Sequence, residues 1–462
     1  MKKYSELTRN TFIFGLSTAG IKIVSFILLP LYTSKINAIE MGSITILSTV
    51  IAILIPILTL GLNIGIIRFS MDKDIDDSKI YTSLLIVWFI SIFVLLLMYP
   101  IFIQINSINK FISYLYIIYI LNSFEVLISQ YVRGKELIKI FALSGVIKTI
   151  VLGLSNVLFL AILDYSSVGY LLSIIASYIC SIFYLLIFGV KIKKLFVIDF
   201  DYLVFKSIIL FSLPFIPNSI SWWINNASDK FLILHFLGEE ATGIYSVANR
   251  IPSLLILFTI VFNQAWQITA IKKYKNTSRK YFSEVFQQYG TLLFTACSFI
   301  IFLSPFLAKI LFQNEYFIAW KFVPFLLVAM VAGALANYYD ALIISSKKTK
   351  NIFYATSIAA IFNITLNIIL IPIVGIMGAA ISTMISYIII FLIKIYTAKR
   401  LDIYFKIHPI IFILLILVVF QTFIQTSVNN ILNLYSFVVV ISVLAISLRQ
   451  IINIFKKLLP EI

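Results

Sequence analysis

The stretch Ile80–Gln104, which reads IYTSLLIVWFISIFVLLLMYPIFIQ, carries no charged residue and is long enough to cross a lipid bilayer. An α-helix rises ~1.5 Å per residue, so about 20 apolar residues cross the ~30 Å of hydrocarbon in a membrane. A stretch of similar length, Lys406–Gln425, lies near the end of the chain. Stretches of this length predict membrane-spanning helices.

Such stretches fill most of the chain. Of its 462 residues, 61% are hydrophobic and only 12% are charged, which lies far outside the range of soluble globular proteins. The sequence therefore predicts an all-α polytopic membrane protein. We predict about fourteen membrane-spanning helices, with the approximate ranges 11–34, 43–67, 80–104, 111–132, 140–163, 167–190, 207–235, 242–270, 287–312, 318–345, 352–372, 377–398, 406–426 and 431–453.

The basic residues predict the orientation of these helices. When the loops are assigned alternately to the two sides, most of the 36 Lys and Arg residues fall on the side of the N-terminus, and we count Lys394 of the twelfth stretch among them. By the positive-inside rule that side is cytoplasmic, so both termini are predicted to be cytoplasmic. The net charge of +17 is thus a topology signal. Short clusters in alternate loops argue against nucleic-acid binding, which needs a continuous basic surface.

The loops are too short to hold a catalytic domain outside the membrane. The sequence has no glycine-rich phosphate-binding loop ending in Gly-Lys-Ser or Gly-Lys-Thr, and its only histidines are His235 and His408. We therefore predict that the protein is not an enzyme and holds no cofactor or metal. A membrane glycosyltransferase or polymerase is the less favoured alternative.

The second half of the chain repeats the first. The segment Asn122–Ile128 (NSFEVLI) recurs as Asn337–Ile343 (NYYDALI), so Asp340 repeats the position of Glu125. Chance similarity between apolar helices is the alternative explanation. A six-helix unit repeated once keeps its orientation and leaves a central cavity between the two copies. We predict two six-helix lobes and a C-terminal helix pair, with the boundaries 1–200, 201–400 and 401–462.

Several motifs carry a resemblance to a known family. The motifs are Arg9-Asn10-Thr11, Leu29–Thr33 (LPLYT), Leu60–Leu62 (LGL), Leu213–Pro217 (LPFIP), Gly243–Ala248 (GIYSVA) and Gln264–Trp266 (QAW). In these the chain resembles the bacterial polysaccharide repeat-unit flippases of O-antigen, capsule and exopolysaccharide synthesis. That family belongs to the multidrug/oligosaccharidyl-lipid/polysaccharide exporter superfamily, and the resemblance extends from about residue 9 to residue 400.

The resemblance implies a transporter that moves undecaprenyl-pyrophosphate-linked oligosaccharide units across the bacterial cytoplasmic membrane by alternating access, for capsule or lipopolysaccharide synthesis. Its expected partners are this polyprenyl-linked saccharide, the lipid bilayer, and the polysaccharide polymerase with its chain-length machinery. Two alternatives share the fold. One is a lipid-linked peptidoglycan-precursor flippase, which is similar in having fourteen helices, and the other is a drug/cation antiporter.

Seven ionisable residues lie well inside the predicted helices, where a lipid-facing charge costs about 2.5–3.5 kcal/mol. They are Lys22, Glu125, Lys148, Asp229, Lys230, Arg250 and Asp340. We expect them to face protein or a polar cavity, in which cations replace the water around a diphosphate headgroup. For each of them a structural ion pair between helices is the alternative. As substrate-binding residues we predict Lys22, Arg250, Asn225 and Lys230.

The two carboxylates of the repeat are predicted to have different roles. Glu125 lies 11 residues before the predicted cytoplasmic turn near Glu136 and Lys148 lies 12 after it, so both sit ~17 Å of helix from that turn. We predict that they form a structural ion pair. Asp340 finds no cation at the mirrored depth of the eleventh helix. An unpaired carboxylate in a site of low dielectric can bind H⁺ or Na⁺, so we assign Asp340 to ion coupling, with a hydrogen bond to the eleventh helix as the alternative.

Overall fold

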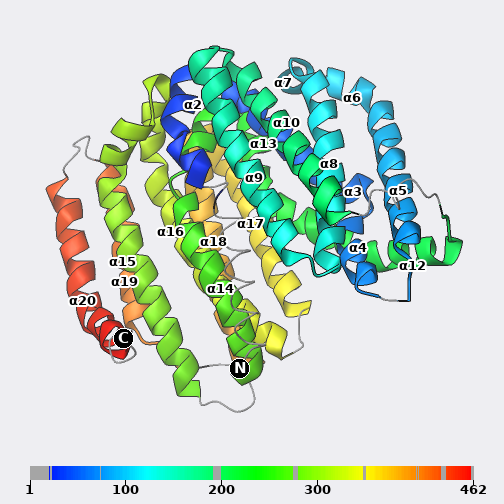
Figure 1. Ribbon diagram of the computed structural model, residues 1–462. Helices are drawn as coiled ribbons and strands as arrows, with labels where there is room; N and C mark the ends of the chain where they lie inside the picture. The colour runs from blue at the N-terminus through cyan, green and yellow to red at the C-terminus, as the bar shows by residue number, and fades with distance from the viewer. Residues whose placement is uncertain are drawn as a thin grey trace. The chain divides into compact units, whose positions relative to one another are not determined.

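The computed structural model describes residues 20, 23–72, 74–190, 199–273, 279–346, 350–401, 403, 405–427 and 433–458. Within these ranges the regular structure is helical and no β-strand occurs, as the predicted fold class requires (Figure 1). The chain divides into two compact units. The first holds the residues up to Leu234 together with Glu239–Gly243, and the second holds His235–Gly238 and the chain from Ile244 onward.

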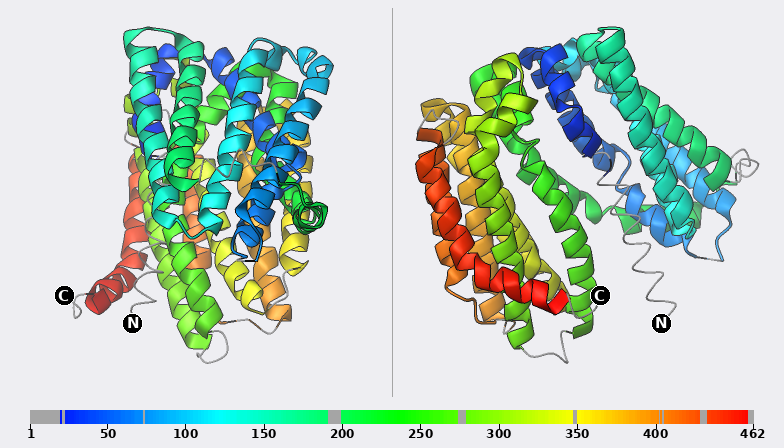
Figure 2. Two further views of the ribbon diagram at one scale, coloured as in Figure 1. Left: turned by 45° about the vertical axis from the view of Figure 1, so that its right-hand side comes forward. Right: turned by 60° about the vertical axis from the view of Figure 1, so that its left-hand side comes forward.

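The first unit is a bundle in which α9 and α10 run side by side and α8 packs against α10 (Figures 1 and 2). Buried apolar side chains of α4, α5 and α8, such as Leu62, Leu84 and Leu127, form its core. Its helices are α2 (Leu29–Lys35), α3 (Ala38–Leu58), α4 (Leu62–Ser70), α5 (Asp77–Leu97), α6 (Tyr99–Ile103), α7 (Asn106–Asn109), α8 (Ile112–Gly134), α9 (Ile138–Asn156), η1 (Val157–Ile162), α10 (Ser166–Tyr184), η2 (Leu185–Gly189), α12 (Tyr202–Ser212) and the first part of α13 (Phe215–Ala248).

The second unit is built around α16, which packs closely against α18 and also contacts α14 and α15. Small residues on α16 permit this closeness: a Cβ added to Gly333 would lie 2.7 Å from the Tyr387 ring of α18. The helices that follow α13 are α14 (Ser253–Lys273), α15 (Arg279–Leu311), η3 (Asn314–Lys321), α16 (Val323–Ser345), α17 (Lys350–Val374), α18 (Ile376–Arg400), α19 (Ile410–Ser427) and α20 (Leu434–Leu458).

Ten helical segments of the described chain are long and apolar enough to cross a membrane, or eleven if one bent pair counts as a single span. Each of the ten coincides with a predicted span. Of the predicted span 11–34, the structure describes residue 20 and residues 23–34, which include most of α2. The remaining three, 207–235, 242–270 and 431–453, fall on α12 and α13, on α13 and α14, and on α20. The chain is therefore a multi-pass membrane protein, and the total of fourteen spans stays a prediction.

Several of the predicted spans are interrupted, and two of the breaks have a local cause in the sequence. The stretch 43–67 breaks after α3, where Leu60 and Gly61 adopt positive φ angles of 53° and 64°, and α4 begins at Leu62. Glycine takes this left-handed conformation without the steric cost that a side chain adds. The stretch 207–235 breaks at Pro214, which lies between α12 and α13 and has no backbone N–H to continue a helix.

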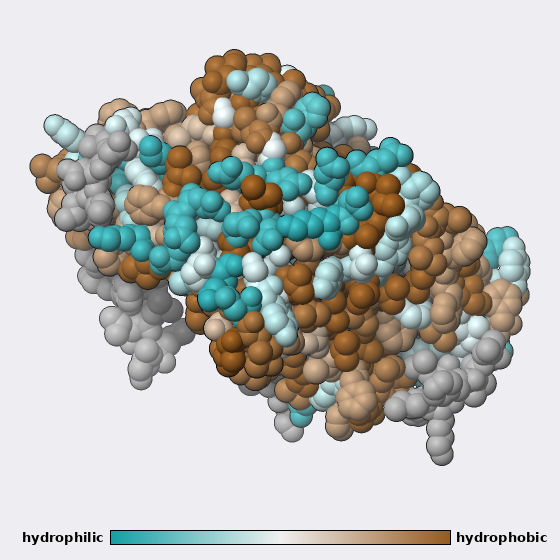
Figure 3. All heavy atoms as spheres, turned by 90° about the horizontal axis from the view of Figure 1, so that it is seen from above, coloured by the Kyte–Doolittle hydropathy of each residue, from teal (hydrophilic) through white to brown (hydrophobic). Residues whose placement is uncertain are grey.

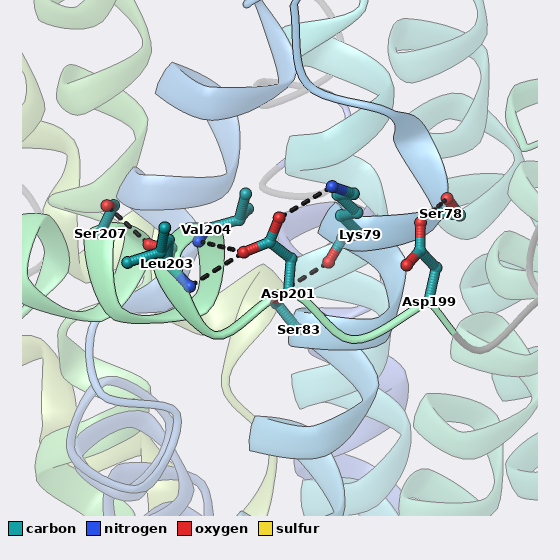
Figure 4. Close-up of polar contacts among 8 residues, drawn as sticks. All are labelled: Ser78, Lys79, Ser83, Asp199, Asp201, Leu203, Val204 and Ser207. Carbon is teal, nitrogen blue, oxygen red and sulfur yellow. Dashed lines mark hydrogen bonds and ion pairs between the residues drawn. The ribbon is translucent and has the colours of Figure 1, made fainter.

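Helix α12 runs crosswise to α5 and is fixed to it at its first turn (Figures 1 and 4). Asp201 caps α12 by accepting hydrogen bonds from the backbone N–H groups of Leu203 and Val204, at 2.9 and 3.2 Å. Its other oxygen lies 2.8 Å from the Lys79 Nζ of α5. This charge-assisted hydrogen bond is the main cause that lowers the pKa of Asp201 below its ordinary value. Capping and ion pairing thus place α12 in the first unit.

The first compact unit consequently extends to Leu234, apart from the segment Glu239–Gly243, whereas the sequence predicts the lobe boundary at residue 200. A second contact explains why Glu239–Gly243 also belongs to the first unit. The backbone of α3 packs so closely against Glu239 that a Cβ added to Gly42 would lie 1.9 Å from the Glu239 carbonyl oxygen. In addition, the Ser43 hydroxyl donates a hydrogen bond of 2.9 Å to the Glu239 carboxylate. The boundaries of the sequence repeat stay a prediction.

The surface has the distribution expected of a protein embedded in a bilayer. Large apolar side chains such as Phe93, Leu154 and Ile361 are exposed on the outside of long helices. Viewed from above, hydrophilic side chains gather on the end of the molecule and apolar side chains cover much of the remaining visible surface (Figure 3). An apolar flank of this kind is stable in hydrocarbon and not in water.

Candidate functional site

Glu125 is the centre of a polar cluster inside the first unit. It lies on α8 and its side chain is buried, with Oε2 at 3.3 Å from the Lys148 Nζ of α9. Its other carboxylate oxygen accepts a hydrogen bond of 3.0 Å from the Ser181 hydroxyl of α10. The ion pair predicted from the equal distances of Glu125 and Lys148 from the turn is therefore present. The Ser181 hydroxyl, which the sequence does not predict as a partner, binds the second carboxylate oxygen.

Lys148 has a second partner in the same cluster. Its Nζ lies 4.1 Å from the centre of the Tyr178 ring, over the ring face. A cation in this position is attracted by the negative face of the aromatic ring, and the attraction grows when water is excluded. Three helices, α8, α9 and α10, thus meet at one neutral cluster, since the negative charge of Glu125 balances the positive charge of Lys148.

Exchanging the two charges tests whether this pair is structural. Glu125→Lys and Lys148→Glu alone each place two like charges at one depth, and we expect each to reduce the yield of folded protein in the membrane severalfold. The double variant restores opposite charges, and we expect most of the yield to return. Fluorescence-detected gel filtration measures the yield of folded protein. A double variant whose yield is no higher than that of the worse single variant would show that Glu125 and Lys148 do not form a stabilising pair.

Asp340 of α16 does not stand alone, and this corrects the expectation of an unpaired carboxylate. Its Oδ2 lies 2.7 Å from the Lys394 Nζ of α18. The Lys394 side chain is only 2% exposed and that of Asp340 is 17% exposed. The mirrored depth of the eleventh helix indeed offers no cation to Asp340, but the cation comes from the twelfth helix instead.

The sequence does not single out Lys394 as a site residue, because its position near the cytoplasmic end of the twelfth span makes it one of the topology signals. The structure places it inside α18, six residues before the end of the helix at Arg400. One sequence signal distinguishes it from the loop cations. Lys394 is flanked on both sides by apolar residues, in the order Phe391, Leu392, Ile393, Lys394, Ile395, whereas Lys399 and Arg400 are adjacent at the helix end.

Aromatic packing positions the turn of α16 that carries Asp340. The Tyr338 hydroxyl donates a hydrogen bond of 2.8 Å to the Phe282 carbonyl oxygen of α15, and its own carbonyl accepts one of 3.1 Å from the Trp266 indole of α14. The Tyr339 ring stacks on Phe405 with 5.4 Å between centroids. These contacts fix α16 against its neighbours and hold the Asp340 carboxylate at a constant depth.

The structure does not test the four predicted substrate-binding residues as a group. Lys22 lies outside the described residues, and the side chain of Asn225 is not described. Lys230 is half-buried and already has a polar partner. Arg250 is half-buried in the turn between α13 and α14, where its carbonyl accepts a hydrogen bond of 2.6 Å from the Ser253 hydroxyl.

The described residues contain no group of three or more His, Cys, Asp or Glu side chains that could hold a metal ion. The two clusters instead offer paired opposite charges inside helical bundles. Such pairs let ionisable groups reside at membrane depth, because each charge is satisfied by its partner and not by water. They are suited to holding helices together.

Comparison with known proteins supports the assignment of the chain as a helical multi-pass membrane protein. The sequence profile of the family described as polysaccharide biosynthesis protein matches residues 7–267, which is more than half of the chain. The profile of the family described as MatE matches residues 214–369. No curated protein sequence matches the chain.

Solved structures resemble the chain along most of its length. An inward-facing multidrug resistance MATE family transporter of the MOP superfamily aligns with a TM-score of 0.70 and 14% identity, covering 83% of this chain and 95% of that one. The lipid II flippase MurJ in an inward closed conformation aligns with a TM-score of 0.67 and 17% identity, covering 97% and 100%. A MOP superfamily transporter from Pyrococcus furiosus aligns with a TM-score of 0.58 and 13% identity, covering 85% and 95%. At these identities the likeness establishes the fold alone.

Proposed function

Because the chain belongs to the polysaccharide biosynthesis protein family, we propose that it moves undecaprenyl-pyrophosphate-linked oligosaccharide units across the bacterial cytoplasmic membrane by alternating access. We infer that the chain is a flippase or exporter with the fold of MOP superfamily transporters. The nature of the cargo is our proposal, and the family match over residues 7–267 is the observation that carries it. The polysaccharide polymerase and its chain-length machinery are the proteins expected to take over the translocated unit.

The buried charges support a polar route for an anionic headgroup. A diphosphate that crosses bare hydrocarbon would lose its hydration without compensation, so a flippase has to offer cations along the path. We assign the cationic contacts to Lys22, Lys230 and Arg250 and a hydrogen-bonding contact to Asn225, the four residues that the sequence predicts to bind substrate. Arg250 has the most suitable chemistry, because its planar guanidinium keeps its charge and can grip two phosphate oxygens at once.

Deleting the gene tests the proposed cargo. We expect the deletion strain to lose its surface polysaccharide and to accumulate lipid-linked repeat units on the cytoplasmic leaflet, because synthesis continues while translocation stops. Immunoblotting of surface polymer and mass spectrometry of extracted lipids measure both. Normal surface polymer in a strain that has no second flippase gene would refute the proposal, and re-expression of the intact chain is the control.

The orientation in the membrane is proposed from the charge distribution and can be tested on one helix. Helix α8 has 23 residues and is therefore about 35 Å long, so its two ends lie on opposite sides. After Cys180 and Cys297 have been replaced, we expect a cysteine at Asn106 to react with an impermeant maleimide in intact cells. A cysteine at Lys139 should react only after permeabilisation, and the reverse pattern would invert the topology.

A drug/cation antiporter is the second candidate, because the MatE profile matches residues 214–369. It predicts that small hydrophobic cations cross vesicles that contain the purified protein and that lipid-linked saccharide does not compete with them.

A further inference from the structure

We propose that Lys394 is the resident cation of the second unit: its ammonium group occupies the cation position beside Asp340 and makes this carboxylate independent of dissolved Na⁺. Lys394 is then the residue that determines ion specificity at this site. The consequence for transport rests on the proposed flippase function, since only a transporter needs a coupling ion. The proposed ion selectivity of the site is argued only from contacts within the second unit.

The two repeated carboxylates differ in how they are satisfied. In the first unit both oxygens of Glu125 have partners, the Lys148 ammonium and the Ser181 hydroxyl. In the second unit Asp340 Oδ2 binds Lys394, while its Oδ1 is buried and has no hydrogen-bond partner among the described residues. Within the part of the chain that the structure describes, Asp340 therefore has one cationic partner, and that cation is covalently part of the chain.

The counterpart of Lys148 in the repeat does not supply a charge. Asn363 of α17 takes that position, and its side-chain oxygen accepts a hydrogen bond of 3.0 Å from Asn367 one turn later. The ammonium group comes from α18 instead and is 2% exposed. One carboxylate and one ammonium group give a neutral site. A Na⁺ ion entering it would leave one uncompensated positive charge inside the bundle, which is costly.

Removing the ammonium group should reverse this selectivity. With methionine at position 394, a side chain of similar length remains, but the Asp340 carboxylate then has no cation and one oxygen already free. Na⁺ is the cation that a NaCl solution supplies in excess, and carboxylate oxygens are suitable ligands for it. The variant should therefore acquire a Na⁺ site that the natural protein lacks.

The experiment measures Na⁺ binding on purified full-length protein, so it needs no saccharide. The thermal unfolding midpoint is recorded in NaCl and in choline chloride at equal ionic strength. An ion that binds only the folded state raises this midpoint, so a higher midpoint in NaCl reports Na⁺ binding. We expect no Na⁺-specific rise for the natural protein, a rise of about 1–3 °C for Lys394→Met, and none for Lys394→Met combined with Asp340→Asn. Binding of ²²Na⁺ to the same samples provides a second readout.

Two outcomes overturn the proposal. One is Na⁺ binding by the natural protein that Asp340→Asn abolishes, and this arm does not require any Lys394 variant to fold. The other is a folded Lys394→Met protein that binds no Na⁺. Lys394→Gln, which keeps a hydrogen-bond donor beside Asp340, is measured in parallel as the milder variant. A failure of the proposed flippase function shows in the saccharide experiments and leaves these Na⁺ measurements unchanged.

Discussion

Lys394→Met is expected to lower the free energy of unfolding by about 3–5 kcal/mol in the absence of Na⁺, because it leaves the Asp340 carboxylate in the bundle without its partner. The Lys394 side chain is 2% exposed and that of Asp340 17%, so little water can reach the carboxylate to replace the lost ammonium group. Methionine fills similar space, so the loss reports the charge and not a cavity. Reversible unfolding in a detergent titration measures it.

A double variant separates the ion pair from other effects. Lys394→Met with Asp340→Asn removes both charges, and we expect it to recover most of the lost stability, since a neutral amide is far less costly to bury. Lys148→Met serves as the matched control in the first unit. It should cost less, because Lys148 is 19% exposed and Glu125 keeps the Ser181 hydrogen bond. Equal losses in the single and double variants would show that Lys394 and Asp340 are not energetically coupled.

Arg250→Ala is expected to reduce saccharide export about 10- to 100-fold at unchanged protein level, which corresponds to the loss of a charge-assisted contact of about 1.5–3 kcal/mol. Arg250→Lys should retain part of the export, because it keeps the charge but not the planar fork. Translocation of a fluorescent lipid-linked saccharide in vesicles measures the rate.

The matched control for Arg250 is Arg400→Ala, which removes an exposed arginine at the end of α18. It should leave export near the natural level. If Arg250→Ala exports at the natural rate, then Arg250 does not contact the headgroup, and the remaining assigned residues, Lys22, Asn225 and Lys230, have to be examined in the same assay.

The two ion pairs show which contacts can be deduced from sequence. Glu125 and Lys148 lie on consecutive helices joined by a short turn, so counting residues from that turn gives the depth of each side chain. Asp340 and Lys394 lie on α16 and α18, with the whole of α17 between them in the chain. Residue counting gives depth but not which helices are neighbours. Residue counting therefore could not predict the contact between α16 and α18. For this reason the expectation that Asp340 lacks a cation is wrong.

The division into compact units differs from the predicted boundary of the sequence repeat, and that boundary stays a prediction. The repeat predicts a boundary at residue 200, yet α12 follows that point and is tied to α5 by the Lys79–Asp201 pair. Nothing in the apolar pattern of 207–235 distinguishes a helix that crosses a bundle from one that runs along it. The direction of α12 depends on the Lys79–Asp201 pair, which joins two residues far apart in the chain.

The sequence by itself determined the class of this protein: a chain of long apolar helices, its interior charges, and its membership of the family. These properties depend on composition and on spacing along one helix, because the cost of placing a residue in hydrocarbon acts on each segment separately. Only the tertiary structure decided which charges meet. The Lys394–Asp340 pair depends on which faces of α16 and α18 pack together, and that choice follows from the small and aromatic side chains of several helices at once.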